Sequence, residues 1–159
     1  MFIILGLSSL IFILDQLTKF WVRNTFSLGQ SRPLLPGIFH LTFVTNTGSA
    51  FGLFPGARSF FIILSILTLL VLLTLAWRKR RKLSLLVQLS FGLLLGGVAG
   101  NLIDRLRFGY VVDFLDFRIW PAFNIADSSI TLGVIFLSYH LLIRNRKPSE
   151  ALANASHTF

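Results

Sequence analysis

Long apolar runs alternate with short polar segments along this chain, and four of the runs are long enough to cross a membrane. A transmembrane helix needs about 20 mostly apolar residues, and the runs at about 2–21, 59–77, 83–103 and 125–143 have that length. This pattern predicts an all-α integral membrane protein with four transmembrane helices. We expect a single membrane domain over residues 1–147, with long connections at 22–58 and 104–124, and a tail over 148–159.

Alternating apolar and polar residues predict β-strands inside both long connections. Residues 38–45 place Phe39, Leu41 and Phe43 on one face and His40 and Thr42 on the other, between segments rich in Pro, Gly and Asn. A second β-rich run covers residues 109–117. The two runs predict a small β-sheet region outside the spans.

The basic residues indicate how the chain is oriented in the membrane. Five of the 15 Lys and Arg residues form the run 78–82, and Arg144, Arg146 and Lys147 add three more after the last span, whereas the connection 22–58 holds only three. Basic loops stay on the cytoplasmic side, so we expect both termini inside and both long connections outside. The net charge of +9 is explained by this clustering, which serves as an orientation signal and does not indicate a groove that binds nucleic acid. We therefore expect no nucleic-acid partner.

The composition excludes several kinds of chemistry. The chain has no Cys, which excludes disulfides, thiolate zinc sites and a Cys nucleophile. It has no His-Glu-x-x-His motif, and its three His residues are scattered, so we expect no metal and no cofactor. A nucleophile formed by Ser49 with His40 remains an open alternative.

Five of the six acidic residues are aspartates that the expected topology brings to the outer membrane boundary. They are Asp15, Asp104, Asp113, Asp116 and Asp127. A charge at the bilayer centre costs at least about 2.5 kcal/mol, so such acids need a partner or a function. Two carboxyl groups sharing a proton can hydrolyse a peptide bond, one as base on a water and the other as acid toward the carbonyl. The pair able to face each other is Asp113 and Asp127.

Several of these polar residues also have structural interpretations. Asp15 and Lys19 are spaced i,i+4 on one helix and can neutralise each other. Asp104 with Arg105 can anchor the third span at the interface. Asp116 follows Asp113 by three residues, so in an extended segment the two side chains point to opposite faces.

Two further patterns favour helix capping and close helix packing. Asn124 is a credible N-cap of the fourth span, with Asp127 at position N3. Gly92, Gly96 and Gly100 recur every four residues in the third span, which is typical of a close helix contact.

The residues by themselves leave three classes of function open. A hydrolase would use paired aspartates, an ion-coupled transporter would use Asp and Lys as a relay, and an assembly protein would pack through the glycine face. A transporter predicts polar residues along the whole membrane depth, whereas the inner half of each predicted span is almost purely apolar.

Five short blocks of the chain carry most of its polar residues at the predicted outer boundary: Leu14–Lys19, Thr45–Gly52, Gly97–Leu106, Val111–Phe114 and Phe123–Ser128. In this order they resemble the signature blocks of the bacterial lipoprotein signal peptidases, the signal peptidase II family. The resemblance implies an aspartic endopeptidase that removes the signal peptide of prolipoproteins immediately before a diacylglyceryl-modified cysteine.

The resemblance also implies roles for individual residues. It makes Asp113 and Asp127 the catalytic dyad. Supporting or substrate-binding roles fall to Asp15, Lys19, Asn46, Gly48, Ala50, Asn101, Asp104, Arg105, Asn124 and Ala126. The implied partners are diacylglyceryl-modified prolipoproteins and membrane lipids, and we expect a monomer. The implied location is the bacterial cytoplasmic membrane, with the active site at the outer face and a surface helix that we place at 51–60.

Overall fold

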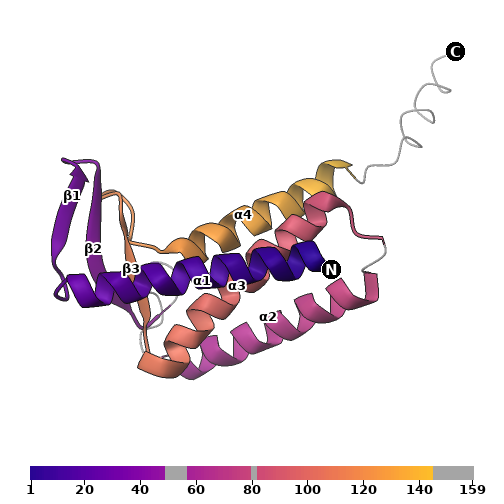
Figure 1. Ribbon diagram of the computed structural model, residues 1–159, viewed down its shortest axis with the longest axis horizontal. Helices are drawn as coiled ribbons and strands as arrows, with labels where there is room; N and C mark the ends of the chain where they lie inside the picture. Colours follow the sequence, from indigo (N-terminus) through magenta and orange to yellow (C-terminus); the bar gives the residue numbers. More distant parts are fainter. Residues whose placement is uncertain (49–56, 80–81, 145–159) are drawn as a thin grey trace, which may run out of the picture.

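Four long helices form a bundle in the computed structural model, which describes residues 1–48, 57–79 and 82–144 (Figure 1). They are α1 (Phe2–Thr25), α2 (Arg58–Lys79), α3 (Leu85–Phe108) and α4 (Ile125–Tyr139), and a π-helical turn, η2 (His140–Arg144), continues α4. The helices α1, α2 and α3 and the stretch Ile125–Leu142, formed by α4 and the start of η2, have the length and apolarity to cross a membrane, which confirms the four predicted spans. The helices α1 and α3 extend a few residues beyond the predicted ends.

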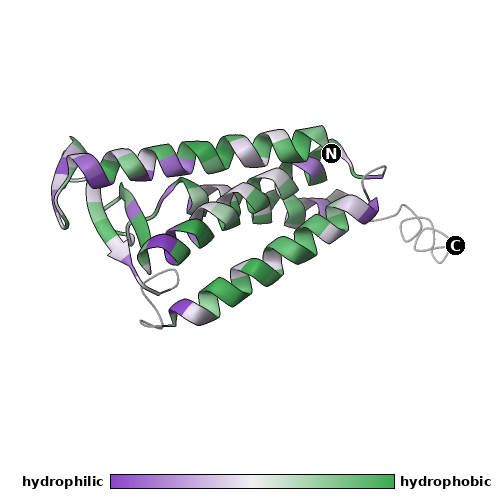
Figure 2. Ribbon diagram, turned by 60° about the horizontal axis from the view of Figure 1, so that its bottom comes forward, coloured by the Kyte–Doolittle hydropathy of each residue, from purple (hydrophilic) through white to green (hydrophobic). Residues whose placement is uncertain are grey.

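Helix α3 lies at the centre of the bundle and packs against the other three helices. In its most apolar window 61% of the residues are buried, against 11–17% in the other helices. Most apolar side chains of α1, α2 and α4 therefore lie on the outside of the bundle, and Figure 2 shows these helices as largely hydrophobic. An apolar exterior is what a lipid environment requires.

The glycines of α3 allow the close packing that the sequence predicted. A Cβ on Gly96 would lie 2.7 Å from the carbonyl oxygen of Ser8 on α1. A Cβ on Gly97 would collide with Ser129 and with the carbonyl oxygen of Ala126, both on α4. The small residues therefore bring three helices of one chain together.

A three-stranded antiparallel sheet lies at one end of the bundle (Figure 1). Its strands are β1 (Ser31–Leu35), β2 (Phe39–Asn46) and β3 (Val111–Asp116), in the order β1-β2-β3. Both predicted strands are confirmed, but β1 was not predicted because it contains Pro33 and all of its residues are exposed. Pro is tolerated there because β1 is an edge strand.

The apolar face of the sheet packs against the end of α1. Phe43, Val112 and Phe114 from the sheet are buried against Val22 and Phe26 of the α1 end. This contact brings β3 next to the polar segment of α1. It thereby sets the position of Asp113, which follows Val112 on β3.

Some predicted features lie outside the described residues. These are Ser49, Ala50, the tail 148–159 and positions 51–56 of the expected surface helix. Residues 58–60 of that expected surface helix belong instead to α2, which begins at Arg58. The division into one domain and a tail stays a prediction.

Candidate active site

The polar residues of the bundle gather at the end that carries the sheet. Asp15 of α1, Asp104 of α3 and Asp113 of β3 are each at most 2% exposed. Asp127 lies in the first turn of α4 and is only partly buried. Segments from four elements thus place their carboxyl groups at one level of the molecule.

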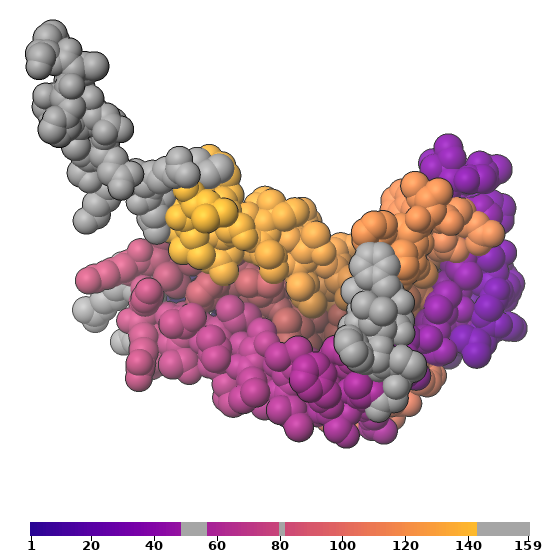
Figure 3. Space-filling model, turned by 180° about the vertical axis from the view of Figure 1, so that it is seen from behind, coloured from indigo at the N-terminus to yellow at the C-terminus, as the bar shows by residue number. Residues whose placement is uncertain are grey.

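A cavity of about 670 Å³ opens beside two of these aspartates. Asp113 and Asp127 both line it, together with the polar side chains of Asn46, Asn101 and Arg105. The remaining wall is mainly apolar and comes from Val111, residues 120–123 and the α4 residues 128 and 130–132. In Figure 3 the surface dips between gold α4 and the orange segment before it.

Asp113 is held by two side-chain amides. The Nδ2 of Asn124 donates to Asp113 Oδ1 at 2.6 Å, and the Nδ2 of Asn46 donates to Asp113 Oδ2 at 3.1 Å. Burial, followed by the negative charge of Asp127, raises the pKa of Asp113 to about 7, although both amides oppose the shift. A carboxyl group in this environment is a proton donor near neutral pH.

Asp127 receives a different set of donors. The Nδ2 of Asn101 donates to Asp127 Oδ1 at 2.7 Å, and the backbone N–H of Asn124 donates to Asp127 Oδ2 at 3.3 Å. The Asn124 side chain accepts from the Asp127 N–H at 2.8 Å, which completes the predicted capping box. Asp127 therefore both completes the cap of α4 and lines the cavity. The positive end of the α4 dipole favours a charged Asp127.

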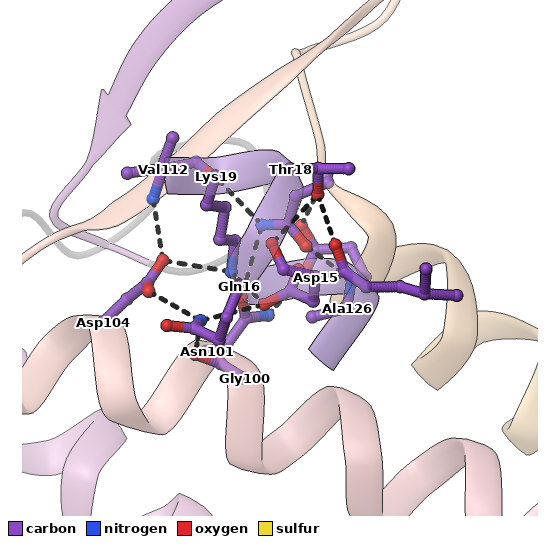
Figure 4. A network of polar contacts seen from close by, with 12 residues as sticks. Asp15, Gln16, Thr18, Lys19, Gly100, Asn101, Asp104, Val112 and Ala126 are labelled. Carbon is purple, nitrogen blue, oxygen red and sulfur yellow. Dashed lines mark hydrogen bonds and ion pairs between the residues drawn. The ribbon is translucent and has the colours of Figure 1, made fainter. Parts of the chain in front are cut away.

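Lys19 is the centre of a buried ion cluster (Figure 4). Its ammonium group lies 2.9 Å from Asp15 Oδ2 and 3.0 Å from Asp104 Oδ2, and it donates to Asn101 Oδ1 at 2.9 Å. The predicted pairing of Asp15 with Lys19 is confirmed. The interpretation of Asp104 with Arg105 as an anchor at the interface is wrong, because both are buried and Asp104 pairs with Lys19 across two helices.

The remaining described residues from the predicted set also surround this cluster. Arg105 Nη2 donates to the carbonyl oxygen of Gly48 at 3.0 Å, and the Gly48 N–H donates to Asn46 Oδ1 at 3.0 Å. The N–H of Ala126 donates to Asp15 Oδ1 at 3.0 Å. Arg105 therefore connects α3 to the segment after β2, close to Asp113.

Asp116 and His40 belong to a separate polar group on the sheet. Asp116 accepts from Thr42 at 2.7 Å and from Arg118, and His40 Nδ1 lies 3.1 Å from Ser31 Oγ. Asp116 therefore points to other partners than Asp113 does, as the spacing predicted. His40 does not line the cavity beside Asp113, so its own contacts give no support to a pairing with Ser49.

Gln16 is a polar residue of the site that the sequence analysis missed. Its Nε2 lies 3.2 Å from Asp15 Oδ2, 3.0 Å from Asp104 Oδ1 and 3.2 Å from the carbonyl oxygen of Gly100. The signal was available, since an amide between Asp15 and Lys19 in an apolar helix needs a partner. Which partner it finds depends on α3.

The site offers acid–base chemistry. Two carboxyl groups face one cavity with different hydrogen-bond donors, so one can hold a proton while the other is charged. Among the described residues no group of three or more His, Cys, Asp or Glu is arranged to hold a metal ion. The carboxyl pair can therefore activate a water next to a bound carbonyl group.

Comparison with known proteins decides the family. The family model described as signal peptidase (SPase) II matches residues 7–143, which is most of the chain. The chain belongs to the signal peptidase II family. This finding confirms the resemblance carried by the five sequence blocks, and it makes the chain a member of a peptidase family.

Relatives in this family match the chain over most of their length. The lipoprotein signal peptidase of Nostoc punctiforme is 56% identical over 128 residues, covering 79% of this chain and 80% of that protein. The lipoprotein signal peptidase of Halothermothrix orenii is 47% identical over 132 residues, covering 83% and 90%. A solved bacterial membrane enzyme superposes with a TM-score of 0.84 at 37% identity, covering 91% of both chains. The four-helix bundle with its sheet is therefore shared with a bacterial membrane enzyme of known structure.

Proposed function

We propose that this protein is a membrane-embedded aspartic endopeptidase, with Asp113 and Asp127 as its catalytic dyad. The observation that carries the proposal is the placement of both carboxyl groups on the wall of one cavity at the sheet end of the bundle. The relatives named lipoprotein signal peptidase support a prolipoprotein as substrate. The bond cut is the one immediately before the diacylglyceryl-modified cysteine.

The two aspartates divide the acid and base roles according to their surroundings. Asp127, at the positive end of α4 and with N–H donors on both oxygens, takes a proton from water as the water attacks the carbonyl carbon. Asp113, with its pKa near 7, donates its proton to the carbonyl oxygen. A tetrahedral diol results.

Collapse of the diol restores the dyad. The carbon–nitrogen bond breaks, and the cysteine nitrogen takes the proton that Asp127 holds. Asp113 takes back a proton from the diol hydroxyl as the carbonyl reforms. Each carboxyl group ends in its starting state, so the cycle needs no further reactant than water.

The position of the cavity suits a substrate that is anchored in lipid. A signal peptide is itself a membrane segment, and the acyl chains on the cysteine hold the scissile bond at the boundary of the bilayer. The cavity lies at the end of the bundle and has a mainly apolar wall, part of it on α4. Anchoring at the correct depth supplies orientation, which can lower a barrier by several kcal/mol. We accordingly place the site at the outer face of the bacterial cytoplasmic membrane.

The test is cleavage of a synthetic diacylglyceryl prolipopeptide by the purified protein in lipid nanodiscs. Asp113→Asn and Asp127→Asn keep the shape of the side chain but cannot exchange a proton, and we expect each to lower the cleavage rate by at least about 100-fold. Asp116→Asn is the matched control, because Asp116 contacts Thr42 and Arg118 on the sheet, and it keeps most of the activity. Peptide without the lipid is cut far more slowly.

Two results would overturn the proposal. Wild-type cleavage rates in either dyad variant, at matched amounts of folded protein, would remove Asp113 and Asp127 from the chemistry. Equal cleavage rates for lipidated and unlipidated peptide would contradict the proposal that the acyl chains anchor the scissile bond at the depth of the site.

The alternative functions have less support. A transporter needs polar groups along the membrane depth, whereas the buried charged residues that the structure describes are gathered at the sheet end. An assembly protein would use the glycine face for a partner, whereas Gly92, Gly96, Gly97 and Gly100 already face α1 or α4 of the same chain.

A further inference from the structure

Two buried aspartates outside the dyad hold the backbone next to each dyad residue. Asp15 Oδ1 accepts from the N–H of Ala126, which directly precedes Asp127. Asp104 Oδ2 accepts from the N–H of Val112, which directly precedes Asp113, at 3.2 Å. In each case a buried carboxylate therefore accepts a hydrogen bond from the backbone N–H of the residue that precedes a residue of the proposed dyad.

Those two carboxylates are connected to each other by two side chains of α1. Lys19 lies between them as a cation, 2.9 Å from Asp15 Oδ2 and 3.0 Å from Asp104 Oδ2. Gln16 forms a second, neutral connection from Nε2 to Asp15 Oδ2 and Asp104 Oδ1. Figure 4 shows both side chains reaching from α1 toward α3 between the two acids.

We propose that Gln16 is a positioning residue that, together with Lys19, fixes the separation of Asp113 and Asp127. The two connections act on α4 through Asp15 and Ala126, and on β3 through Asp104 and Val112. Lys19 alone joins one oxygen of each carboxylate through a single atom, which leaves the two groups free to turn about that atom. The second connection through Gln16, which also reaches the Gly100 carbonyl oxygen, prevents that rotation.

The electrostatics of the cluster also require Gln16. One ammonium group faces two carboxylates in a buried site, so the donors on Lys19 do not satisfy every carboxylate oxygen. Gln16 supplies the donor for Asp104 Oδ1, and the two backbone N–H groups supply further donors. An amide is suited to this place because it donates without adding charge.

This inference rests on the proposed function, and it predicts an effect on turnover instead of on substrate binding. Gln16→Met keeps the length of the side chain and removes the donor. We expect kcat for the lipidated peptide to fall by about 10- to 100-fold, because small misplacements of reacting groups have effects of that size. KM changes by less than about twofold, because Gln16 does not line the cavity.

The pH profile distinguishes positioning from a general loss of structure. Repulsion between two close carboxyl groups separates the two limbs of the pH–rate profile, so a looser pair gives a narrower bell. We expect Gln16→Met to narrow the profile. Gln88→Met is the matched control, since the Gln88 amide donates only to Leu83 within its own segment among the described contacts, and it leaves kcat and the profile unchanged.

A second variant keeps the test decisive if Gln16→Met does not fold. Gln16→Asn retains an amide but is one methylene too short to span both carboxylates, and we expect the same loss of kcat and the same narrowing. Wild-type kcat and profile width in either folded variant, while Asp113→Asn and Asp127→Asn remain inactive, would overturn the positioning role and leave the dyad intact. Failure of both Gln16 variants to fold would assign Gln16 to stability instead of positioning.

Discussion

A carboxyl group buried beside a second carboxyl group lowers the stability of the folded state once it ionises, and Asp113 is in that situation. Burial and the charge of Asp127 raise the pKa of Asp113 from 3.8 to about 7. The folded protein therefore binds more protons than the unfolded chain between about pH 4 and pH 7, so this residue's contribution to stability falls as pH rises through that range. The shift corresponds to at most about 4 kcal/mol.

Removing this charge should therefore stabilise the protein in a pH-dependent way. We expect Asp113→Asn to raise the thermal unfolding temperature relative to the wild type more at pH 8 than at pH 4. Thermal unfolding in one detergent at both pH values is the measurement. A difference that is the same at both pH values would show that Asp113 ionises normally in the folded state.

Asp116 provides a control, because its pKa is shifted in the opposite direction to that of Asp113. Burial alone would raise its pKa, but hydrogen bonds from Thr42 and Arg118 lower it below the usual value. Its contribution to stability is therefore present above about pH 4 and is lost as pH falls. Asp116→Asn should lower the unfolding temperature at pH 8 and have little effect at pH 3.

At the scale of the elements, the position of the site depends on how closely α3 approaches its neighbours. Gly97 faces Ser129 and Ala126 on α4, and Gly100 faces Asp15 on α1. These contacts keep the first turn of α4 and the polar segment of α1 within hydrogen-bond distance, as the bond from Ala126 to Asp15 shows. A larger side chain on α3 would separate the groups that hold the dyad.

The corresponding prediction concerns Gly97→Ala. The added Cβ would collide with α4, so we expect a loss of about 1–3 kcal/mol in the free energy of unfolding, together with reduced cleavage. Gly6→Ala is the control, because a Cβ there meets no atom within 4 Å. Equal stability of the two variants, measured by thermal unfolding, would contradict the close approach of α3 and α4.

At the scale of the whole molecule, the site must face the side of the membrane where its substrate is cut. The basic run 78–82 predicts that the connection between α2 and α3 is cytoplasmic, and therefore that the sheet and the proposed dyad are outside. Residues 117–122, between β3 and α4, belong to the same outer end, and Ile119 there is 95% exposed.

Thiol labelling tests this orientation, and the chain has no Cys of its own to give a background. A cysteine replacing Ile119 should react with an impermeant thiol reagent added to intact spheroplasts. A cysteine replacing Lys82, which is also exposed, should react only after lysis. The reverse pattern would place the dyad on the cytoplasmic side and contradict the proposed location.

The features that depend on local pattern could be predicted from the amino-acid sequence. The four spans follow from hydropathy, β2 and β3 from alternation, and the α4 capping box from the spacing of Asn124 and Asp127. The pairing of Asp15 with Lys19 also follows from spacing, because both residues lie on one helix. In each case the interacting groups are neighbours along the chain, so the period of the helix or strand places them together.

The contacts between polar groups of different elements depend on tertiary packing and could not be predicted from local pattern. Asp104 and Arg105 are adjacent, which favoured a shared role, yet packing turns Asp104 to Lys19 and Arg105 to Gly48. The position of Gln16 in an apolar helix signalled that its amide needs a partner, but not which one, because the partner Asp104 on α3 lies 88 residues away in the chain. Hydropathy reports which segments can cross the membrane. The partner of a buried polar group instead depends on the approach and rotation of two helices, which the close contacts of the α3 glycines determine.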